Sequence, residues 1–389
     1  MNPRIRVIVS AAERSGDAHA SNLVREVLRR RPDVEFEGFG GDLLRQEGCK
    51  VHEDLVSLSS MGIGFLSHLR RYFRAVKTFD RLLVTAAPCA VLLVDSPGLN
   101  FVLARLARWR GVPVVYYICP QIWAWAPWRR AKVLRYTNLL LTILPFEADL
   151  YRNPDVPVVS VGHPLGDALA AVPPDAGRAL RERLRIPSTE RVIAILPGSR
   201  AHEVDDLMPL FRRIVDHMGL DPASHRLLIS SSSEEFRARV EEALFGCRVP
   251  HEVLPDDSRT LVQASDLVLV KSGTASLEAA YFEKPMLVLY KVGVIQRLFF
   301  GLYSVTPFIA LPNILGASLT GGDPTVYERL CNGTEAPELA PIARTLLEEG
   351  PAREEAIARL RRLKGAVFPR GATARAADAL LEFVAARGI

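Results

Sequence analysis

The sequence predicts an α/β protein with two doubly wound domains, each a parallel sheet covered by helices. Short runs rich in Val, Ile and Leu alternate with helical patterns along most of the 389 residues, and this alternation is typical of βα units. The pattern stops between Gly162 and Pro174, where five Pro and Gly residues gather, and then restarts. At ~100–200 residues per domain, a chain of this length is expected to form two domains.

The strands expected in the first domain are the apolar runs 6–10, 34–40, 90–96, 112–119, 139–145 and 157–162, with a helix over Ala18–Arg31. The strands expected in the second domain are 191–199, 225–232, 251–255, 266–273 and 284–292. Two amphipathic helices, 345–365 and 372–388, are expected near the end because apolar residues recur there with helical spacing. The domains are therefore expected at 1–165 and 166–367.

Composition and charge narrow the class of protein. Hydrophobic residues make up 49% and charged residues 24%, as in an ordinary globular protein. The net charge of +5 favours anionic partners such as phosphorylated substrates, acidic lipid or nucleic acid, although a solvated arginine-rich surface gives the same charge. The five cysteines have no metal-ligand spacing and are expected to be reduced. The longest apolar region, 112–128, is interrupted by prolines and is a poor membrane span.

Two strand ends in the second domain suit a phosphate group. Gly198, Ser199 and Arg200 follow one strand, and Ser272, Gly273 and Thr274 follow another. Free N–H groups at a helix start bind anions, and arginine adds a forked charge. Glu278 lies one turn after Thr274, where it could accept hydrogen bonds from a ribose. Plain βα turns and helix caps are the alternatives. No Walker A or GxGxxG sequence is present.

Strand ends of the first domain carry acids. Glu13, Ser15 and Asp17 follow the opening strand, and Asp95 follows the run VLLV before a turn expected at Pro97-Gly98. Asp95 is placed as a general base would be, although an Asx-turn is common at such a position. We expect Ser15 or Asp17 to cap the first helix.

Two aromatic and apolar segments suit a lipid. The segment CPQIWAWAPW, 119–128, carries Gln121 and three tryptophans, which favour boundaries between apolar and wet surroundings. The segment 61–77 has an apolar arc and an opposite basic arc. An interfacial helix on an anionic membrane and a helix that packs on the sheet both explain it. Its expected membrane-contact residues are Ile63, Phe65, Leu66, Leu69 and Phe73.

The motifs taken together resemble the lipid-A-disaccharide synthase family. The ordered set is AERSGD, MGI, VDSPGLN, CPQIWAW, LPFE, VGHPLGD, LPGSR, SGTASLE and LPN, from residue 12 to residue 313. The resemblance implies a GT-B fold, with two Rossmann-like domains facing a cleft and a C-terminal helix, 368–389, that crosses back to the first domain. It implies an inverting hexosyltransferase that needs no metal and no cofactor.

The family's reaction joins UDP-2,3-diacylglucosamine to 2,3-diacylglucosamine 1-phosphate (lipid X). The products are tetraacyl lipid A disaccharide 1-phosphate and UDP. The resemblance also implies a peripheral protein on the cytoplasmic face of a Gram-negative inner membrane, with an anionic membrane surface as partner. No nucleic acid is expected as a partner, and a homodimer stays open.

The resemblance assigns roles to matching residues. Asp95 would be the general base on the acceptor's 6-hydroxyl, and Glu13 and Arg200 would complete the catalytic group. On the donor side it implies a second set of residues: Gly198, Ser199, Arg200, Ser272, Gly273, Thr274, Glu278 and Asn313. On the acceptor side it implies a third set: Ser15, Asp17, Gln121, Trp123 and Trp125. The chain departs from the family at Arg14 and over 314–331.

Two other functions stay open from the sequence alone. Another GT-B enzyme, such as a lipid-linked N-acetylglucosaminyl transferase or a UDP-N-acetylglucosamine 2-epimerase, would fit the second-domain loops but not the first-domain motifs. A non-catalytic lipid- or nucleic-acid-binding protein would use the clustered aromatics and arginines, but no RNA-binding motif is present.

Overall fold

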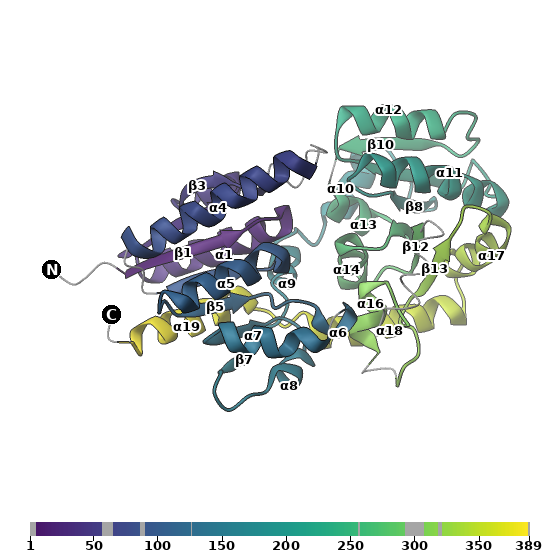
Figure 1. Ribbon diagram of the computed structural model, residues 1–389. Coiled ribbons are helices and arrows are strands. Elements are labelled where there is room, and N and C mark those ends of the chain that lie inside the picture. Colours follow the sequence, from purple (N-terminus) through teal and green to yellow (C-terminus); the bar gives the residue numbers. More distant parts are fainter. Residues whose placement is uncertain are drawn as a thin grey trace. The chain divides into compact units, whose positions relative to one another are not determined.

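The chain folds into two compact α/β units, each with one parallel sheet (Figure 1). The computed structural model describes residues 5–56, 65–85, 90–125, 127–255, 257–291, 307–317 and 321–387. Unit 1 comprises Met1–Asp167 and Phe368–Ile389, and unit 2 comprises Ala168–Val367. The prediction of two doubly wound α/β domains is confirmed.

Unit 1 contains a seven-stranded sheet with the order β3-β2-β1-β4-β5-β6-β7. Its strands are β1 (Ile5–Ala11), β2 (Val34–Gly40), β3 (Lys50–Asp54), β4 (Ala90–Val94), β5 (Val114–Tyr117), β6 (Leu139–Thr142) and β7 (Val158–Ser160). The paired strands run parallel, and β1, β4, β5 and β6 are buried almost throughout. Burial on both faces explains why these strands read as continuous apolar runs.

The helices of unit 1 cover this sheet. They are α1 (Arg14–Arg30), α2 (Asp42–Gln46), α4 (Phe65–Thr85), α5 (Pro97–Trp109), α6 (Ile122–Trp125), the 3-10 turn η1 (Pro127–Arg129), α7 (Arg130–Tyr136), α8 (Glu147–Tyr151), α9 (Leu165–Ala170) and α19 (Ala372–Ala385). Helices α4, α5 and α7 share one core with the sheet, while α19 packs beside α1. Asp167 accepts hydrogen bonds from the backbone N–H groups of Gly371 (2.7 Å) and Thr373 (2.8 Å), which fixes the start of α19.

Unit 2 contains a six-stranded parallel sheet with the order β10-β9-β8-β11-β12-β13. Its strands are β8 (Arg191–Leu196), β9 (His225–Ser231), β10 (His251–Pro255), β11 (Leu267–Lys271), β12 (Met286–Lys291) and β13 (Tyr327–Cys331). Its helices are α10 (Ala176–Arg183), α11 (Ala201–Met218), α12 (Glu234–Ala243), α13 (Ser258–Ala264), α14 (Thr274–Tyr281), α16 (Leu311–Gly316), α17 (Ala336–Leu347) and α18 (Pro351–Val367). One core joins the sheet to α11, α12 and α17, and a smaller one joins it to α10 and α13.

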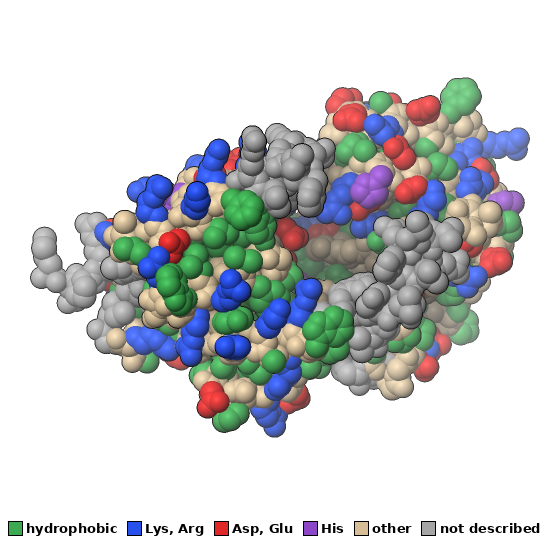
Figure 2. Space-filling model, in the orientation of Figure 1, with side chains coloured by type: hydrophobic (Ala, Val, Ile, Leu, Met, Phe, Trp, Pro, Cys, Tyr) green, Lys and Arg blue, Asp and Glu red, His purple; other side chains and the backbone are tan. Residues whose placement is uncertain are grey.

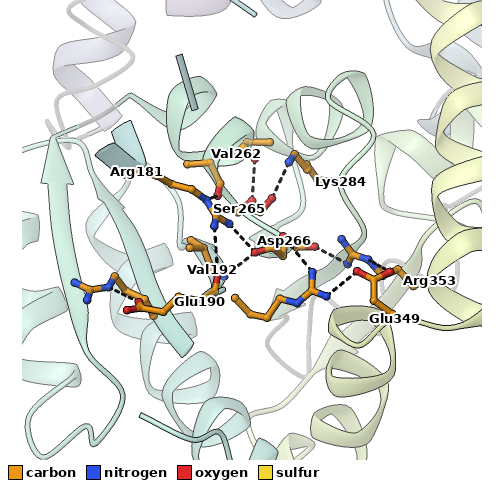
Figure 3. Close-up of polar contacts among 12 residues, drawn as sticks. Arg181, Glu190, Val192, Val262, Ser265, Asp266, Lys284, Glu349 and Arg353 are labelled. Atoms are coloured by element: carbon orange, nitrogen blue, oxygen red, sulfur yellow. Dashed lines mark hydrogen bonds and ion pairs between the residues drawn. The ribbon is translucent and has the colours of Figure 1, made fainter. Parts of the chain in front are cut away.

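A polar cluster ties the amino-terminal edge of this sheet to the helices around it (Figure 3). The carboxylate of Asp266, just before β11, accepts from the guanidinium of Arg181 at 2.7 Å and from the N–H of Val192 at 2.8 Å. The guanidinium of Arg353 donates to the carbonyl of Asp266 at 2.8 Å. Helices α10 and α18 and strands β8 and β11 therefore meet at the side chain and backbone of Asp266.

The sequence does not predict the edge strands β3 and β13, because their polar residues give no apolar run. The single helix expected over 345–365 is wrong. Helix α17 ends at Leu347 and α18 begins at Pro351, a position where proline is favoured because its missing N–H has no helical partner. Among the described residues, no helix is long and apolar enough to cross a membrane.

Candidate active site

Both sheets have the strand order that creates a topological switch point, where ligands bind outside the carboxyl ends of neighbouring strands. In unit 1 the switch point lies between β1 and β4, and in unit 2 it lies between β8 and β11. The predicted site residues follow these strand ends: Glu13 and Asp95 in unit 1, and Arg200 and Ser272 in unit 2.

Asp95 stands on a sharp elbow between β4 and α5. Asp95 and Ser96 both have positive φ, at 51° and 44°, a region that non-glycine residues rarely adopt. The turn expected at Pro97-Gly98 is therefore wrong, because helix α5 begins at Pro97 itself. Strain of this kind persists only where the surroundings fix the backbone.

Three side-chain hydrogen bonds fix the elbow. The carbonyl of Asp95 accepts from the hydroxyl of Tyr116 and from the amide of Asn100, both at 2.7 Å. The amide oxygen of Asn100 accepts from the hydroxyl of Ser10 at 2.8 Å. Strands β1 and β5 and helix α5 therefore hold the backbone that carries the Asp95 carboxylate.

The surroundings of Asp95 raise the pKa of its carboxyl group. Burial, and then the negative charge of Glu13, raise the pKa of Asp95 to about 6, while a hydrogen bond from the Ser96 backbone opposes the shift. Glu13 is exposed at the start of α1, as its N-cap residue. A half-buried carboxylate with a pKa near neutrality suits a general base.

Ser15 and Asp17 differ in exposure and in their contacts. Ser15 is exposed in the first turn of α1. Asp17 is buried and accepts from the backbone N–H groups of Gly41 (2.8 Å) and Leu43 (3.2 Å). The expected capping of the first helix by one of them is wrong, because Asp17 binds the start of α2 and no side chain caps α1. Asp17 supports the fold beside the switch point.

The tryptophan segment follows β5, the strand beside β4. Gln121 is exposed. The indole of Trp123 donates to the carboxylate of Glu147 at 3.2 Å and meets the ring of Phe146 edge-on. Burial raises the pKa of Glu147 to about 7, against the opposing hydrogen bond from Trp123. The side chain of Trp128 is 66% exposed and does not pack in the core. The side chain of Trp125 lies outside the described part of the chain.

In unit 2, one carboxylate joins the two phosphate-type loops. Glu203 in α11 accepts from the N–H of Ser199 (3.0 Å) and from the ammonium of Lys271 (2.9 Å), and lies 3.4 Å from the guanidinium of Arg200. Burial acts to raise the pKa of Glu203, but the hydrogen bond and charge of Lys271 hold it below the usual value. The side chain of Arg200 is 67% exposed, so it is accessible to a ligand.

Gly198 is needed for this arrangement. Its φ is +121°, and a Cβ atom there would lie 2.4 Å from Oε2 of Glu203. Any side chain at 198 would therefore push Glu203 away from Ser199 and Lys271.

The loop after β11 opens α14 without a side-chain cap. Gly273 has a φ of +152°, a Cβ atom there would lie 3.8 Å from Nζ of Lys271, and Thr274 is exposed. The N–H groups at the start of α14 are thus available to an anion. The hydroxyl of Ser272 donates to the carbonyl of Ile309 at 3.1 Å and so fixes the next loop; its role toward the donor stays a prediction.

Glu278 and Asn313 are both engaged within unit 2. Glu278 accepts from the hydroxyl of Ser258 at 2.7 Å and from the guanidinium of Arg259 at 3.3 Å. Asn313 is completely buried, and its amide binds both backbone groups of Val326 and the carboxylate of Glu328. Asn313 therefore holds residues 309–313 beside the Ser272 loop, and its role on the donor side stays a prediction.

The expected membrane-contact residues lie on or before α4. Phe73 is 63% exposed. Ile63 lies outside the described residues, and of Phe65, Leu66 and Leu69 only the helical backbone is described. The opposite face of α4 packs on the sheet through Ala75, Phe79, Leu82 and Leu83. The helix thus packs on the core and still presents Phe73 to the outside.

The sequence reasoning missed the residues that support the site. Glu203 stands three residues after Arg200, the N-cap residue of α11. Because a capping box needs Ser or Thr at the N-cap, this spacing gave no signal from the sequence. Asn100 and Lys271 are adjacent to the predicted motifs, but their partners Ser10 and Glu203 are distant in sequence.

Comparison with known proteins identifies the family. The family model described as lipid-A-disaccharide synthetase matches residues 7–332. The chain is 33% identical to the lipid-A-disaccharide synthase of Pseudomonas syringae pv. tomato over 386 residues, covering 99% of this chain and 98% of that protein. It is 32% identical to the enzyme of that name from Myxococcus xanthus over 381 residues, or 97% of each.

The chain belongs to the lipid-A-disaccharide synthase family. The predicted family is confirmed, and with it a hexosyltransferase of lipid A disaccharide synthesis. The match spans parts of both units, and it disfavours both a non-catalytic binding protein and a different UDP-sugar enzyme.

Solved structures show the same fold at low identity. The UDP-N-acetylglucosamine 2-epimerase from Neisseria meningitidis bound to UDP-GlcNAc has a TM-score of 0.60 at 15% identity, covering 97% of this chain and 100% of that one. MurG from Acinetobacter baumannii has a TM-score of 0.59 at 15% identity, covering 97% and 99%. The predicted GT-B fold class is thereby confirmed.

Proposed function

We propose that unit 1 binds the acceptor lipid X and activates it through Asp95, while unit 2 binds the donor UDP-2,3-diacylglucosamine. The observation that carries this proposal is the Asp95 elbow: a half-buried carboxylate at a switch point, with a pKa of about 6. At neutral pH this group is largely ionised, and it is basic enough to accept a proton from a hydroxyl whose oxygen is forming a bond.

In the proposed reaction, the Asp95 carboxylate removes the proton from the acceptor's 6-hydroxyl. The oxygen attacks the anomeric carbon of the donor as the bond to the UDP oxygen breaks, with inversion at that carbon. The departing UDP carries the electron pair of the broken bond, and its added charge has to be stabilised in the transition state. Asp95 returns its proton to solvent.

Unit 2 offers groups that suit the pyrophosphate. The exposed guanidinium of Arg200 and the N–H groups that open α14 at Thr274 are fixed donors for developing negative charge. Glu203 orients this side by holding Lys271 and the Ser199 loop. We assign the ribose to Glu278, whose carboxylate oxygens can each accept a further hydrogen bond.

The acceptor wall is assigned to Ser15, Gln121, Trp123 and Trp125. Ser15 and Gln121 are exposed polar groups after β1 and β5, and Trp123 is held by Glu147. Indoles suit a ligand that is half lipid and half sugar phosphate. If Trp125→Ala leaves the apparent affinity for lipid X unchanged, this wall is misplaced.

We place the protein at the cytoplasmic surface of the inner membrane, with α4 toward the lipid. Phe73 is exposed among the cationic side chains of α4, and such a helix suits an anionic interface. A homodimer stays a prediction, and the exposed Trp128 is its candidate contact. Sedimentation of the protein at two concentrations tests it, because a dimer should show a larger mass at the higher concentration.

The decisive experiment supplies both lipid sugars and measures UDP release. Release with both substrates, little release with either alone, and loss of release in Asp95→Asn support the proposal. No release from folded protein with both present contradicts it. Turnover of UDP-N-acetylglucosamine alone would instead indicate the epimerase reaction.

A further inference from the structure

One outer face of unit 1 is unusually apolar for a surface. Six large hydrophobic side chains are exposed on helices α4 and α5 and the turn η1 of unit 1: Tyr72, Phe73, Val84, Val102, Trp109 and Trp128. Trp109 is 73% exposed. Figure 2 shows hydrophobic side chains gathered on this face with Lys and Arg among them. Contiguous apolar surface of this kind marks an interaction site.

The elements that form this face are rich in cations. Helix α4 carries five Lys and Arg residues, α5 two, and the stretch 127–136 four. The only acid in these elements is Asp80, which already binds Arg110 at 2.8 and 2.9 Å. Elsewhere in the described chain many arginines have carboxylate partners. This face therefore presents unbalanced positive charge beside apolar groups.

A pocket of about 750 Å³ opens on this face between α4, α5 and α7. Helix α5 contributes Val102, Arg105, Leu106 and Trp109, which share one side of the helix at helical spacing. The opposite side of α5 is buried in the core, and Leu106 packs partly against that core. The exposed Val102 and Trp109 are not explained by folding. The volume is that of a small-molecule site.

Three arginines line the pocket without acidic partners. They are Arg105 and Arg108 from α5 and Arg135 from α7. All three are exposed, and no carboxylate in the described part of the chain forms an ion pair with them. Guanidinium groups bind phosphate through paired hydrogen bonds.

We propose that this pocket binds one anionic phospholipid of the membrane surface. Arg105, Arg108 and Arg135 take its phosphate, while Trp109 and Val102 contact the glycerol and the first acyl carbons. Trp suits this depth because one end of the indole is apolar and the other is polar. Charge complementarity selects an anionic headgroup over a zwitterionic one.

The pocket is separate from the proposed acceptor site. Helix α5 begins at Pro97 beside Asp95, and Arg105 lies ~12 Å further along its axis. The inference extends the membrane association proposed above and rests on it. Its test contains no sugar substrate, so its failure is distinguishable from a failure of the catalytic proposal.

The test titrates the full chain with dihexanoylphosphatidylglycerol, a soluble lipid used below its micelle concentration, and follows tryptophan fluorescence. We expect saturable binding of one molecule. The variant R105Q/R108Q/R135Q should weaken binding about 10-fold or more, because it removes charge-assisted contacts. Trp109→Phe should remove the fluorescence change while equilibrium dialysis still detects the lipid.

The matched control is R71Q/R74Q/K77Q, which removes three charges from α4 outside the pocket. It should retain the affinity of the unaltered protein. Equal weakening in both triple variants would mean diffuse electrostatic attraction and would overturn the proposal. So would equal affinity for dihexanoylphosphatidylcholine, or for glycerol 3-phosphate alone, which would indicate a free phosphate site. If the triple variant unfolds, the single variant Arg135→Gln takes its place and should also weaken lipid binding. The Trp109→Phe titration then tests independently whether the lipid lies beside Trp109.

Discussion

Replacing Asp95 with Asn should abolish activity and, at neutral pH, make unit 1 more stable. The folded protein raises the pKa of Asp95 from 3.8 to about 6, mainly by burial and then through the charge of Glu13. Because the folded pKa lies above the unfolded one, the ionised carboxylate opposes folding. The favourable contribution is complete below pH 4 and is lost as the pH rises through 6.

The magnitude follows from the shift. A difference of about two pKa units corresponds to about 3 kcal/mol at pH 8, at roughly 1.4 kcal/mol per unit. Asn is isosteric, can still accept the backbone hydrogen bond of Ser96, and tolerates positive φ better than most residues. Asp95→Asn should therefore recover part of this energy, about 1–3 kcal/mol, and raise the Tm by several degrees.

The assay is urea unfolding of the unaltered protein and of Asp95→Asn from pH 4 to pH 8. The two free energies of unfolding should agree below pH 4, diverge between pH 4 and pH 6, and keep a constant difference at higher pH. The rate of UDP release should fall roughly 100- to 10,000-fold in the variant, as expected for loss of a general base. A variant that is less stable at pH 8, or a difference that does not change with pH, would refute the electrostatic reasoning. Retained activity would refute the catalytic assignment.

Three further predictions concern the neighbouring charge, the donor loop and the fold. Glu13→Gln should move the acid limb of the pH profile of kcat/KM to lower pH, because it removes a negative charge that raises the pKa of the base; an unmoved limb would contradict this coupling. Gly198→Ala should lower kcat/KM about 100-fold by displacing Glu203, whereas Gly219→Ala, with positive φ and nothing within 4 Å, should affect stability only. Asp266→Ala should lower the free energy of unfolding by about 3 kcal/mol and leave the kcat of folded protein unchanged, as urea unfolding and UDP release can show.

The fold was predictable where strands are buried on both faces. Strands β1, β4, β8 and β11 are central and almost fully buried, so their sequences are continuous apolar runs with little ambiguity. The edge strand β3 reads KVHED and is stabilised by pairing with β2 and by the contact of His52 with Glu37 at 2.9 Å. Solvent on one side permits polar residues there, which removes the apolar signal.

The positions of the site residues were predictable, but not their partners. The carboxyl ends of parallel strands lie at one edge of the sheet, where ligands bind. A residue that directly follows a predicted strand, such as Asp95 or Arg200, can therefore be predicted as a site residue from its position in the sequence. The contact between Lys271 and Glu203 joins two different βα units, and no local pattern encodes it. The same holds for Asn313, whose motif indicates the site but whose buried amide supports the strand β13.

The surroundings of Asp95 affect both its chemistry and the stability of the protein. They raise its pKa, which makes the carboxylate a stronger base, but they also make the folded protein less stable when Asp95 is ionised. The positive φ of Asp95 adds backbone strain. The bonds from Tyr116 and Asn100 offset part of this cost by fixing the carbonyl at the elbow. Since both bonds reach the backbone and neither reaches the carboxylate, they hold the base in position without lowering its pKa. A hydrogen bond to the carboxylate itself would stabilise the elbow further but would make Asp95 a weaker base. The elbow thus places its support on the carbonyl, where it leaves the proposed chemistry intact.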